Sequence, residues 1–350
     1  MSQLQGMDDG QAAAQLRGRL MPTLISWVLL HLVLAALGTW LARGYALRSK
    51  LIDQPGERRS HRAATPRGGG ISIVVVTGLG ALVLSAYWPA QAPLLASFVL
   101  GLLLVAGIGW WDDHRPLSPW LRLAVQGVAA LILGGGFYRS TGLWFPAVAA
   151  VLLVMVLVNV WNFMDGIDGL AATQAGLVAT GVAVVVGFGP WGLVAAGLAA
   201  ATCGFLPFNF PKARVFLGDV GSGALGYMLA ALLLVGIMAG TVMWPLLFLP
   251  LAAFLVDASF TLMARMLRGE RWWTPHVQHA YQRWARSKGR HTQVTWAYGL
   301  FSLGAVIVML IPVGWRPLPA LAICLVWYAI AGWGWWILQK DHFLSGKASR

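Results

Sequence analysis

The segment AVAAVLLVMVLVNVWNFMDGIDGL, residues 147–170, decides the fold class of this chain. Every residue from Ala147 to Val158 is apolar, and two asparagines and two aspartates follow directly. A helix needs about 20 apolar residues to cross the hydrocarbon core of a bilayer. A span that ends in carboxylates, each followed by glycine, indicates that the lipid stops here and that a polar site begins.

The rest of the chain repeats this apolar pattern. Of its 350 residues 58% are hydrophobic and 11% are charged, whereas a soluble domain carries about 25% charged residues. The sequence therefore predicts an all-α polytopic membrane protein with about eleven transmembrane helices. The predicted spans are roughly 23–42, 71–88, 95–111, 121–137, 145–161, 172–188, 191–207, 223–243, 245–264, 294–312 and 318–338.

The basic residues predict how these spans are oriented. Nearly all of the 25 Lys and Arg residues gather in alternate connections, and the other connections hold only Arg17, Arg19, Arg139 and Arg316. Because cytoplasmic loops carry the excess of Lys and Arg, we expect a periplasmic N-terminus and a cytoplasmic C-terminus. This distribution also accounts for the net charge of +13, so no nucleic-acid partner is expected.

The expected organisation is one transmembrane domain, 23–338, between an N-terminal tail, 1–22, and a C-terminal tail, 339–350. Its expected cytoplasmic loops are 43–70, 112–120, 162–171, 208–222 and 265–293. The polar residues before the first apolar run argue against a cleavable signal peptide. Cys203 and Cys324 both lie within apolar runs, so buried reduced thiols are expected rather than a disulfide.

Most of the 12 acidic residues lie at the predicted cytoplasmic ends of the spans. Asp8 and Asp9 are the exceptions at the outer side, and Asp257 lies about two turns inside the ninth span. The positive-inside rule does not require this, because acids contribute little to orientation. The gathering of scarce carboxylates on one face is the observation that a function has to explain.

Asp112 and Asp113 end the third span in the stretch WWDDHR. Adjacent carboxylates repel each other unless a cation lies near them. One interpretation is a polar end to a helix, with Trp110 and Trp111 as interfacial anchors. The other is a metal-associated or proton-accepting pair.

Asn159, Asn162, Asp165 and Asp168 follow one another at intervals of three, so on a helix they would share one face. The glycine after each aspartate favours a turn with exposed backbone N–H groups, which suits a phosphate or the edge of uracil. An ordinary glycine-rich loop is the alternative. An EF-hand is a poor interpretation, because its glycine spacing and terminal Glu are missing.

Asp219 lies between Gly218 and the run of small residues that opens the eighth span, with Lys212 and Arg214 nearby. It is either a functional carboxylate or a simple helix cap, since an acid at a helix N-terminus is stabilised by the helix dipole. Phe216, three residues earlier, could present its ring to a nucleobase.

His276, His279 and Arg283 would share a face of a helix and could bind a pyrophosphate. A zinc site is disfavoured because no third ligand lies nearby in sequence. The alternative is a basic amphipathic segment at the lipid headgroups.

Taken together, these motifs resemble those of the polyprenyl-phosphate N-acetylhexosamine-1-phosphate transferases, the family that includes the MraY and WecA enzymes. The matching stretches, in the order of the family's inner-face motifs, are 53–71, 110–115, 159–171, 208–222 and 275–283. The resemblance implies a Mg²⁺-dependent enzyme, with Mn²⁺ as an alternative ion. It would transfer a sugar-1-phosphate from a UDP-N-acetylhexosamine to undecaprenyl phosphate, giving undecaprenyl-diphospho-sugar and UMP.

The resemblance also implies roles for the matched residues. Asp112 and Asp113 would be tied to catalysis, one of them as the group that deprotonates the lipid phosphate, and Asp219 would hold the metal. Phe216 would stack on uracil. Substrate binding is expected at Asn162, Asp165, Asp168, Phe216, His276, His279, Arg283, Arg58, Arg59 and His61.

Two departures point within the family to the branch that initiates O-antigen synthesis. The stretch PHVQHAYQR, 275–283, replaces the three adjacent histidines of the peptidoglycan branch, and the lysine that this branch carries upstream of TP is missing. The prediction of eleven spans rather than ten points the same way. We therefore expect a multi-pass protein of the bacterial inner membrane with its active site on the cytoplasmic face, and the resemblance allows a homodimer. A cation-coupled transporter is the alternative function, but transporter sites usually lie near the bilayer midplane between repeats, and the chain shows no internal repeat.

Overall fold

The structure is a computed structural model that describes residues 9–54, 64–271, 274, 276–288, 290–311 and 316–345. Among these, the side chains of residues 9–20, 22, 288 and 341–345 are not described. Arg58, Arg59 and His61 lie outside the described residues, so the roles expected for them stay predictions.

Helices make up most of the described chain and there is very little sheet, which confirms the prediction of an all-α polytopic membrane protein. One two-residue strand pair joins Ile52 to Pro66 and Asp53 to Thr65 in antiparallel register. In chain order the elements are α1 (Asp9–Arg48), β1 (Ile52–Asp53), β2 (Thr65–Pro66), α2 (Ile71–Tyr87), η1 (Pro89–Gln91), α3 (Ala92–His114), α4 (Pro119–Thr141), α5 (Trp144–Met164), α6 (Leu170–Val186), α7 (Pro190–Asn209), α8 (Asp219–Ala239), η2 (Trp244–Leu251), α9 (Ala252–Leu267), α10 (Ala280–Lys288), α11 (His291–Leu310) and α12 (Pro317–Ser345).

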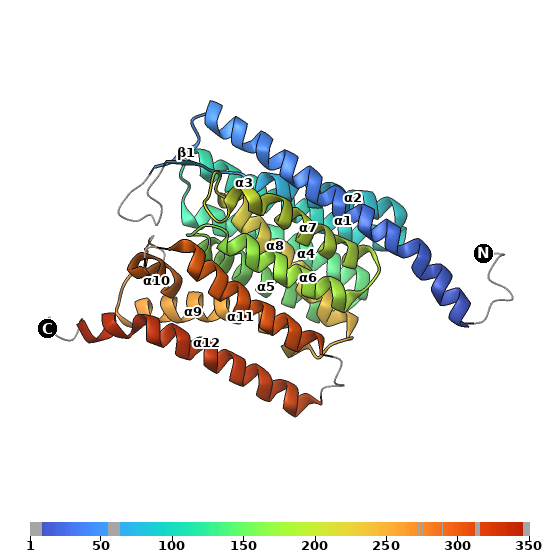
Figure 1. Cartoon of the computed structure of the whole chain (residues 1–350). Coiled ribbons are helices and arrows are strands. Elements are labelled where there is room, and N and C mark those ends of the chain that lie inside the picture. Colours follow the sequence, from blue (N-terminus) through green and yellow to red (C-terminus); the bar gives the residue numbers. More distant parts are fainter. Residues whose placement is uncertain are drawn as a thin grey trace.

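In the described part of the chain, 9 helical segments are long and apolar enough to cross a membrane. Two shorter apolar helices, α2 and α6, have 17 residues each. Each of the eleven predicted spans overlaps one of these segments, because the thickness of the bilayer sets a minimum length for an apolar run. In Figure 1, α1 begins at one end of the molecule and α12 ends at the other.

Helices extend into several of the predicted loops and into both predicted tails. Both long terminal helices continue beyond the predicted spans, α1 from Asp9 and α12 to Ser345. The loop predicted at 112–120 shrinks to residues 115–118, and those at 162–171 and 208–222 shrink to 165–169 and 210–218. Apolar runs mark only the part of a helix that lies in hydrocarbon, so they miss the polar turns at its ends. Asp112 and Asp113 therefore belong to the last turn of α3.

The ninth span is not one α-helix. It begins as the 3₁₀ segment η2 and becomes α-helical at α9. Pro250 lies within η2, and a proline inside an α-helix removes one backbone hydrogen bond and clashes with the carbonyl four residues earlier.

The core of the molecule is built around α8. Within the apolar stretch of α8, 89% of the residues are buried, against 17% in that of α1 and 6% in that of α12. Gly226 lets α8 approach α5 closely, since a Cβ there would clash with the carbonyl oxygen of Leu157. Small residues at such contacts are how membrane helices pack without a hydrophobic driving force.

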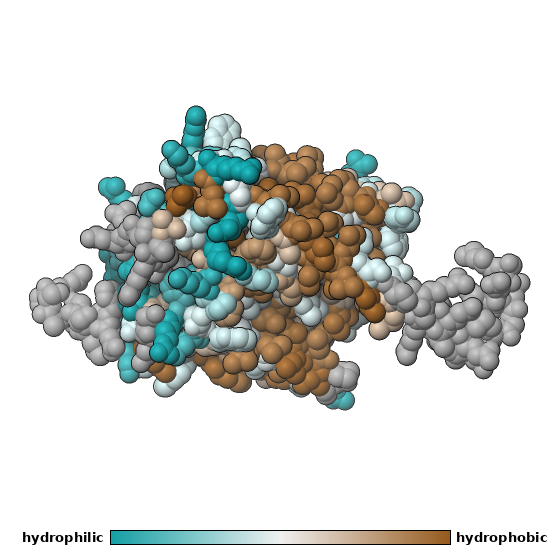
Figure 2. Space-filling view, turned by 45° about the horizontal axis from the view of Figure 1, so that its top comes forward, coloured by the Kyte–Doolittle hydropathy of each residue, from teal (hydrophilic) through white to brown (hydrophobic). Residues whose placement is uncertain are grey.

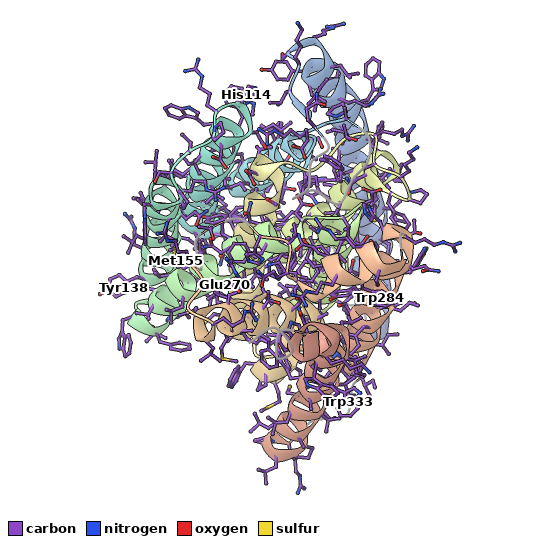
Figure 3. The ribbon with its side chains drawn as sticks, turned by 90° about the vertical axis from the view of Figure 1, so that its left-hand side faces the viewer. His114, Tyr138, Met155, Glu270, Trp284 and Trp333 are labelled. Carbon is purple, nitrogen blue, oxygen red and sulfur yellow. The ribbon has the colours of Figure 1, made fainter. Side chains whose placement is uncertain are left out.

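Polar residues gather at one end of the bundle. Figure 2 shows hydrophilic residues at the left-hand end and an apolar surface over most of the remainder. The same end holds β1 and α10 in Figure 1. Figure 3 views the molecule from this end, with His114 of α3 at the upper edge and Trp284 of α10 on the right.

Candidate active site

A cavity of about 640 Å³ lies among the helix ends that meet at the polar end. The ends of α3 and α5 and the starts of α4 and α8 contribute to its lining, as does the segment before α10. Seven of the predicted site residues line it: Asp113, Asn162, Asp165, Phe216, Asp219, His276 and His279.

Asp113 connects the end of α3 to the start of α8. Its carboxylate accepts hydrogen bonds from the backbone N–H groups of Asp219, at 3.0 Å, and Val220, at 3.1 Å. The guanidinium of Arg67 donates to its carbonyl oxygen and lies 3.7 Å from its carboxylate. Gly218 has φ +78°, and a Cβ there would lie 2.6 Å from the Asp113 carboxylate. Asp113 is thus the cap of α8, a role that a helix N-terminus favours for an acid.

The carboxylate of Asp219 is partly open, with 30% of its side chain exposed. The side-chain amide of Asn162 donates to it at 2.6 Å. Arg122 lies 3.7 Å from its other oxygen and donates to Asp112 at 2.6 Å. The other oxygen of Asp112 accepts the backbone N–H of Leu117. Asp112 does not line the cavity, but Arg122 ties it to Asp219.

Asp165 adds a third carboxylate to the cavity wall directly after the end of α5. Burial raises its pKa well above the ordinary value, and the negative charges of Asp219 and Asp113 raise it further. The cavity therefore brings three carboxylates close enough together that Asp219 and Asp113 disfavour the charged form of Asp165.

The motif at 159–168 does not continue along one helical face as predicted. Asn159 and Asn162 lie on α5, but this helix ends at Met164, so Asp165 and Asp168 lie in the loop beyond it. The glycines after the two aspartates end the regular pattern, which explains the difference.

Asp168 does not line the cavity. Its carboxylate accepts the backbone N–H of Ala213 at 3.3 Å and lies 3.4 Å from His291. Its carbonyl oxygen accepts the hydroxyl of Thr295. Asp168 thus joins the loop at 210–218 to α11, and the substrate-binding role expected for it stays a prediction.

His276 and His279 lie together at the cavity, with ring centroids 4.8 Å apart. Burial, together with the nearby His279 and Arg265, lowers the pKa of His276 to about 4, so its imidazole is neutral at pH 7. The prediction that both histidines and Arg283 share a helix face is wrong, because α10 begins only at Ala280. Arg283 lies on α10 and does not line the cavity.

Sequence reasoning missed several residues of the site. Arg67 lies within the matched stretch 53–71, and Arg122 entered only through the count of basic residues. The positive charge and the position of both arginines can be read from the sequence. Their pairing cannot, because Arg67 meets Asp113, and Arg122 meets Asp112 and Asp219, through contacts between segments that are separate in the chain. Tyr281 and Gln282 also line the cavity; they lie within the matched stretch 275–283, but no role was expected for either residue.

The donor set fits a magnesium ion that is shared with a substrate. In the described part of the chain, no three His, Cys, Asp or Glu side chains are grouped as in a protein-only metal site. Mg²⁺ is usually bound by one or two carboxylates together with substrate phosphates and water. The open carboxylate of Asp219, with Asp165 on the same cavity wall, provides such a partial set.

Known proteins resemble this chain over much of its length. The profile described as glycosyl transferase family 4 matches residues 95–237. A probable undecaprenyl-phosphate N-acetylglucosaminyl 1-phosphate transferase of Bacillus subtilis is 27% identical over 77% of this chain and 80% of its own length. A decaprenyl-phosphate N-acetylglucosaminephosphotransferase of Mycobacterium tuberculosis is 32% identical over 66% of this chain and 65% of its own. A phospho-N-acetylmuramoyl-pentapeptide-transferase of Acaryochloris marina is 33% identical over 67% and 69%.

Proposed function

The chain belongs to glycosyl transferase family 4, the polyprenyl-phosphate hexosamine-1-phosphate transferases, and on that premise we propose its substrates. The donor is a UDP-N-acetylhexosamine and the acceptor is undecaprenyl phosphate. The products are undecaprenyl-diphospho-sugar and UMP. The reaction would be the first membrane step of O-antigen or related cell-envelope polysaccharide synthesis.

The observation that carries this proposal is the cavity at the polar end, where Asp113, Asp165 and Asp219 meet Arg67. Phosphoryl transfer needs positioning and neutralisation of charge more than covalent help from the protein. In the proposed step an oxygen of the lipid phosphate attacks the sugar-bearing phosphorus of the donor. The bond between this phosphorus and the oxygen that bridges the two phosphates breaks, and UMP leaves. We favour this direct attack over a covalent aspartyl-phosphate.

The geometry favours a positioning role for Asp113. Both of its oxygens accept backbone N–H groups of α8, so it holds Asp219 in place. A phosphate monoester has a second pKa of about 6, so the lipid phosphate is largely dianionic at pH 7 and needs little help from a base. Asp112 and Arg122 form a salt bridge beside Asp219, where Arg122 is available to orient a phosphate.

Asp219 would hold Mg²⁺, with Asp165 as a second carboxylate at the same wall. The bound ion would neutralise the diphosphate charge and stabilise the leaving UMP. Phe216 is assigned to the uracil ring. The neutral His276 and its neighbour His279 would offer hydrogen bonds to the sugar and its phosphate.

The concentration of basic residues around the polar end supports a cytoplasmic position for the site in the bacterial inner membrane, under the positive-inside rule. A homodimer remains a prediction from the family resemblance.

The test is UMP release by the purified protein with undecaprenyl phosphate and Mg²⁺. UDP-GlcNAc, UDP-GalNAc and other UDP-N-acetylhexosamines are compared with UDP-N-acetylmuramoyl-pentapeptide. We expect release with an unsubstituted N-acetylhexosamine donor and its loss in EDTA. UMP release with the pentapeptide donor alone would instead assign the protein the activity named for the Acaryochloris relative. No UMP release with any donor would overturn the proposed function.

A further inference from the structure

The helix α9 carries a polar stripe that no part of the proposed reaction uses. Asp257, Thr261 and Arg265 follow one another at intervals of four residues, so they lie along one side of the helix. Each of these three residues is at most 3% exposed. A buried carboxylate within a membrane span points to a functional role. The contacts of Asp257 show which segments of the chain it connects.

Asp257 accepts hydrogen bonds from the start of α10. One carboxylate oxygen accepts the backbone N–H of Ala280 at 2.8 Å, and the other accepts that of Tyr281 at 3.0 Å. The hydroxyl of Tyr298 donates at 2.9 Å and that of Thr261 at 3.2 Å. These contacts make Asp257 the N-terminal cap of α10, supplied by a different helix.

The same carboxylate also lies close to His279, one of the two histidines that line the cavity. His279 Nδ1 is 3.5 Å from Asp257, and the His279 ring stacks between Phe163, with centroids 6.0 Å apart, and Tyr281, at 5.8 Å. The hydroxyl of Tyr281 donates to the Phe163 carbonyl at 2.9 Å. A Cβ at Gly166 would clash with this hydroxyl. Asp257 therefore fixes the histidine segment against the end of α5.

Arg265, two turns further along α9, organises the chain that leads into this segment. Its guanidinium donates to Glu270 at 2.8 Å, to the carbonyl of Arg271 at 3.0 Å and to that of Thr274 at 3.2 Å. Burial alone would raise the pKa of Glu270, but hydrogen bonds from Arg265, Arg268 and Gln278 outweigh it and lower the pKa to about 2. In Figure 3, Glu270 lies to the left of Trp284, a residue of α10.

We propose that Asp257 is a positioning residue for donor binding: it caps α10 and holds His279, so that residues 276–279 present their polar groups to the cavity. Asp257 itself does not line the cavity, so it acts through the segment and not on substrate. This inference rests on the proposed function for the identity of the donor. It also removes the main support for an ion pathway, because the only acidic residue deep within a predicted span is engaged by four hydrogen bonds.

The test replaces Asp257 by Asn. An amide has the same shape, but its NH₂ group must face one of the two backbone N–H donors of α10. We expect backbone amides at 280–283 to exchange hydrogen at least about 10-fold faster, with α8 unchanged. We expect the donor KM to rise at least about 10-fold while kcat falls less than about 3-fold.

The matched control is Ser259→Ala, because Ser259 is a polar residue on the exposed side of the same helix. This variant should keep the wild-type hydrogen exchange at 280–283 and the wild-type donor KM. A double-mutant cycle of Asp257→Asn with His279→Gln should show strong non-additivity in the donor KM. Both changes disrupt the same feature, the position of the His279 side chain at the cavity. If Asp257→Asn does not accumulate as folded protein, Tyr298→Phe removes one donor to the same carboxylate, and a rise of about 3-fold in exchange at 280–283 is expected.

Wild-type exchange at 280–283 in the variant that folds would overturn the proposal. Faster exchange with an unchanged donor KM, equal loosening of α8, or an additive cycle would do the same. If the wild-type protein releases no UMP with any donor, the proposed function fails, but the exchange measurement still decides whether Asp257 holds this segment.

Discussion

Two buried aspartates cap helices near the cavity in the same way: Asp113, which lines the cavity, and Asp257, which does not. Each accepts two successive backbone N–H groups at the start of a helix that follows later in the chain. Asp113 caps α8, which has 21 residues and lies in the core. Asp257 caps α10, which has 9 residues. The cap is the same, but the helices that depend on it differ.

Because of this difference, we expect the Asp113 cap to support catalysis and the Asp257 cap to support binding of the donor. An isolated helix shorter than about 12–15 residues is marginal in water, so α10 needs its cap and its packing to hold the histidine segment. Core packing fixes α8 in any case, and Asp113 serves to orient the carboxylate of Asp219. We therefore expect changes around Asp113 to affect turnover and the metal requirement, and changes around Asp257 to affect donor binding.

The largest effect is expected for Asp219→Asn, which keeps the shape of the side chain and removes its charge. A divalent ion supplies several kcal/mol of transition-state stabilisation, and each 1.36 kcal/mol is a factor of ten in rate. Turnover should fall by about 10³-fold or more in a UMP-release assay. Asp341→Asn, in the predicted C-terminal tail, is the control and should keep the wild-type rate. Equal activity of the two variants would remove the metal assignment.

Asp113→Asn should come next. Loss of a group that orients a metal ligand typically costs 10–100-fold in metal affinity or activity, so both the rate and the Mg²⁺ concentration for half-maximal rate should shift by about that factor. Hydrogen exchange at 280–283 should stay as in the wild type. Faster exchange there would show that the two caps are not independent and would break the comparison.

Gly166→Ala tests the Asp257 side without touching Asp257. The new Cβ would overlap the Tyr281 hydroxyl, and overpacking of this kind costs about 1–3 kcal/mol. We expect the donor KM to rise about 5- to 10-fold, measured at saturating undecaprenyl phosphate. In the Gly166→Ala background, Tyr281→Phe removes the overlapping hydroxyl and should recover at least part of the affinity. A further loss in this double variant would contradict the packing explanation.

The smallest effect is expected for Thr261→Val. It removes one of the four hydrogen bonds to Asp257 and an acceptor for the Trp335 indole N–H, at 3.0 Å. A hydrogen bond contributes about 1 kcal/mol to stability, so thermal stability should drop slightly while the donor KM stays within about 2-fold. A loss of donor affinity as large as that of Asp257→Asn would mean that the whole α9 stripe, and not the cap, positions the segment.

The sequence was most informative about features that depend on residues close to one another in the chain. Apolar runs predicted every span, because a bilayer imposes one length on all of them. Asp165 and Asp219 could be recognised as a group, since few carboxylates occur and most lie at one predicted face. Contacts between segments far apart in the chain could not be predicted this way. The orientation of Asp168 toward α11, the Arg122 bridge and the cap supplied by Asp257 all depend on how helices pack.

Helix ends explain the remaining differences. The loop predicted at 112–120 begins too early because polarity marks the limit of hydrocarbon, whereas α3 continues through His114. The spacing of the histidines suits a helix, but it does not indicate where that helix begins. That helix starts one residue after His279 because its cap comes from α9, which the local spacing does not reveal.

The central claim is that scarce carboxylates share one water-filled cavity on the cytoplasmic side. Single cysteines at positions 165 and 219, in a background with Cys203→Ser and Cys324→Ser, test it with a membrane-impermeant thiol reagent. Arg139→Cys, at the exposed far end of α4, is the control for the opposite side. We predict labelling of 165 and 219 only from the cytoplasmic side and of 139 only from the periplasmic side. Labelling of 165 and 219 from opposite sides of the membrane would contradict the shared cavity and the transferase site built on it.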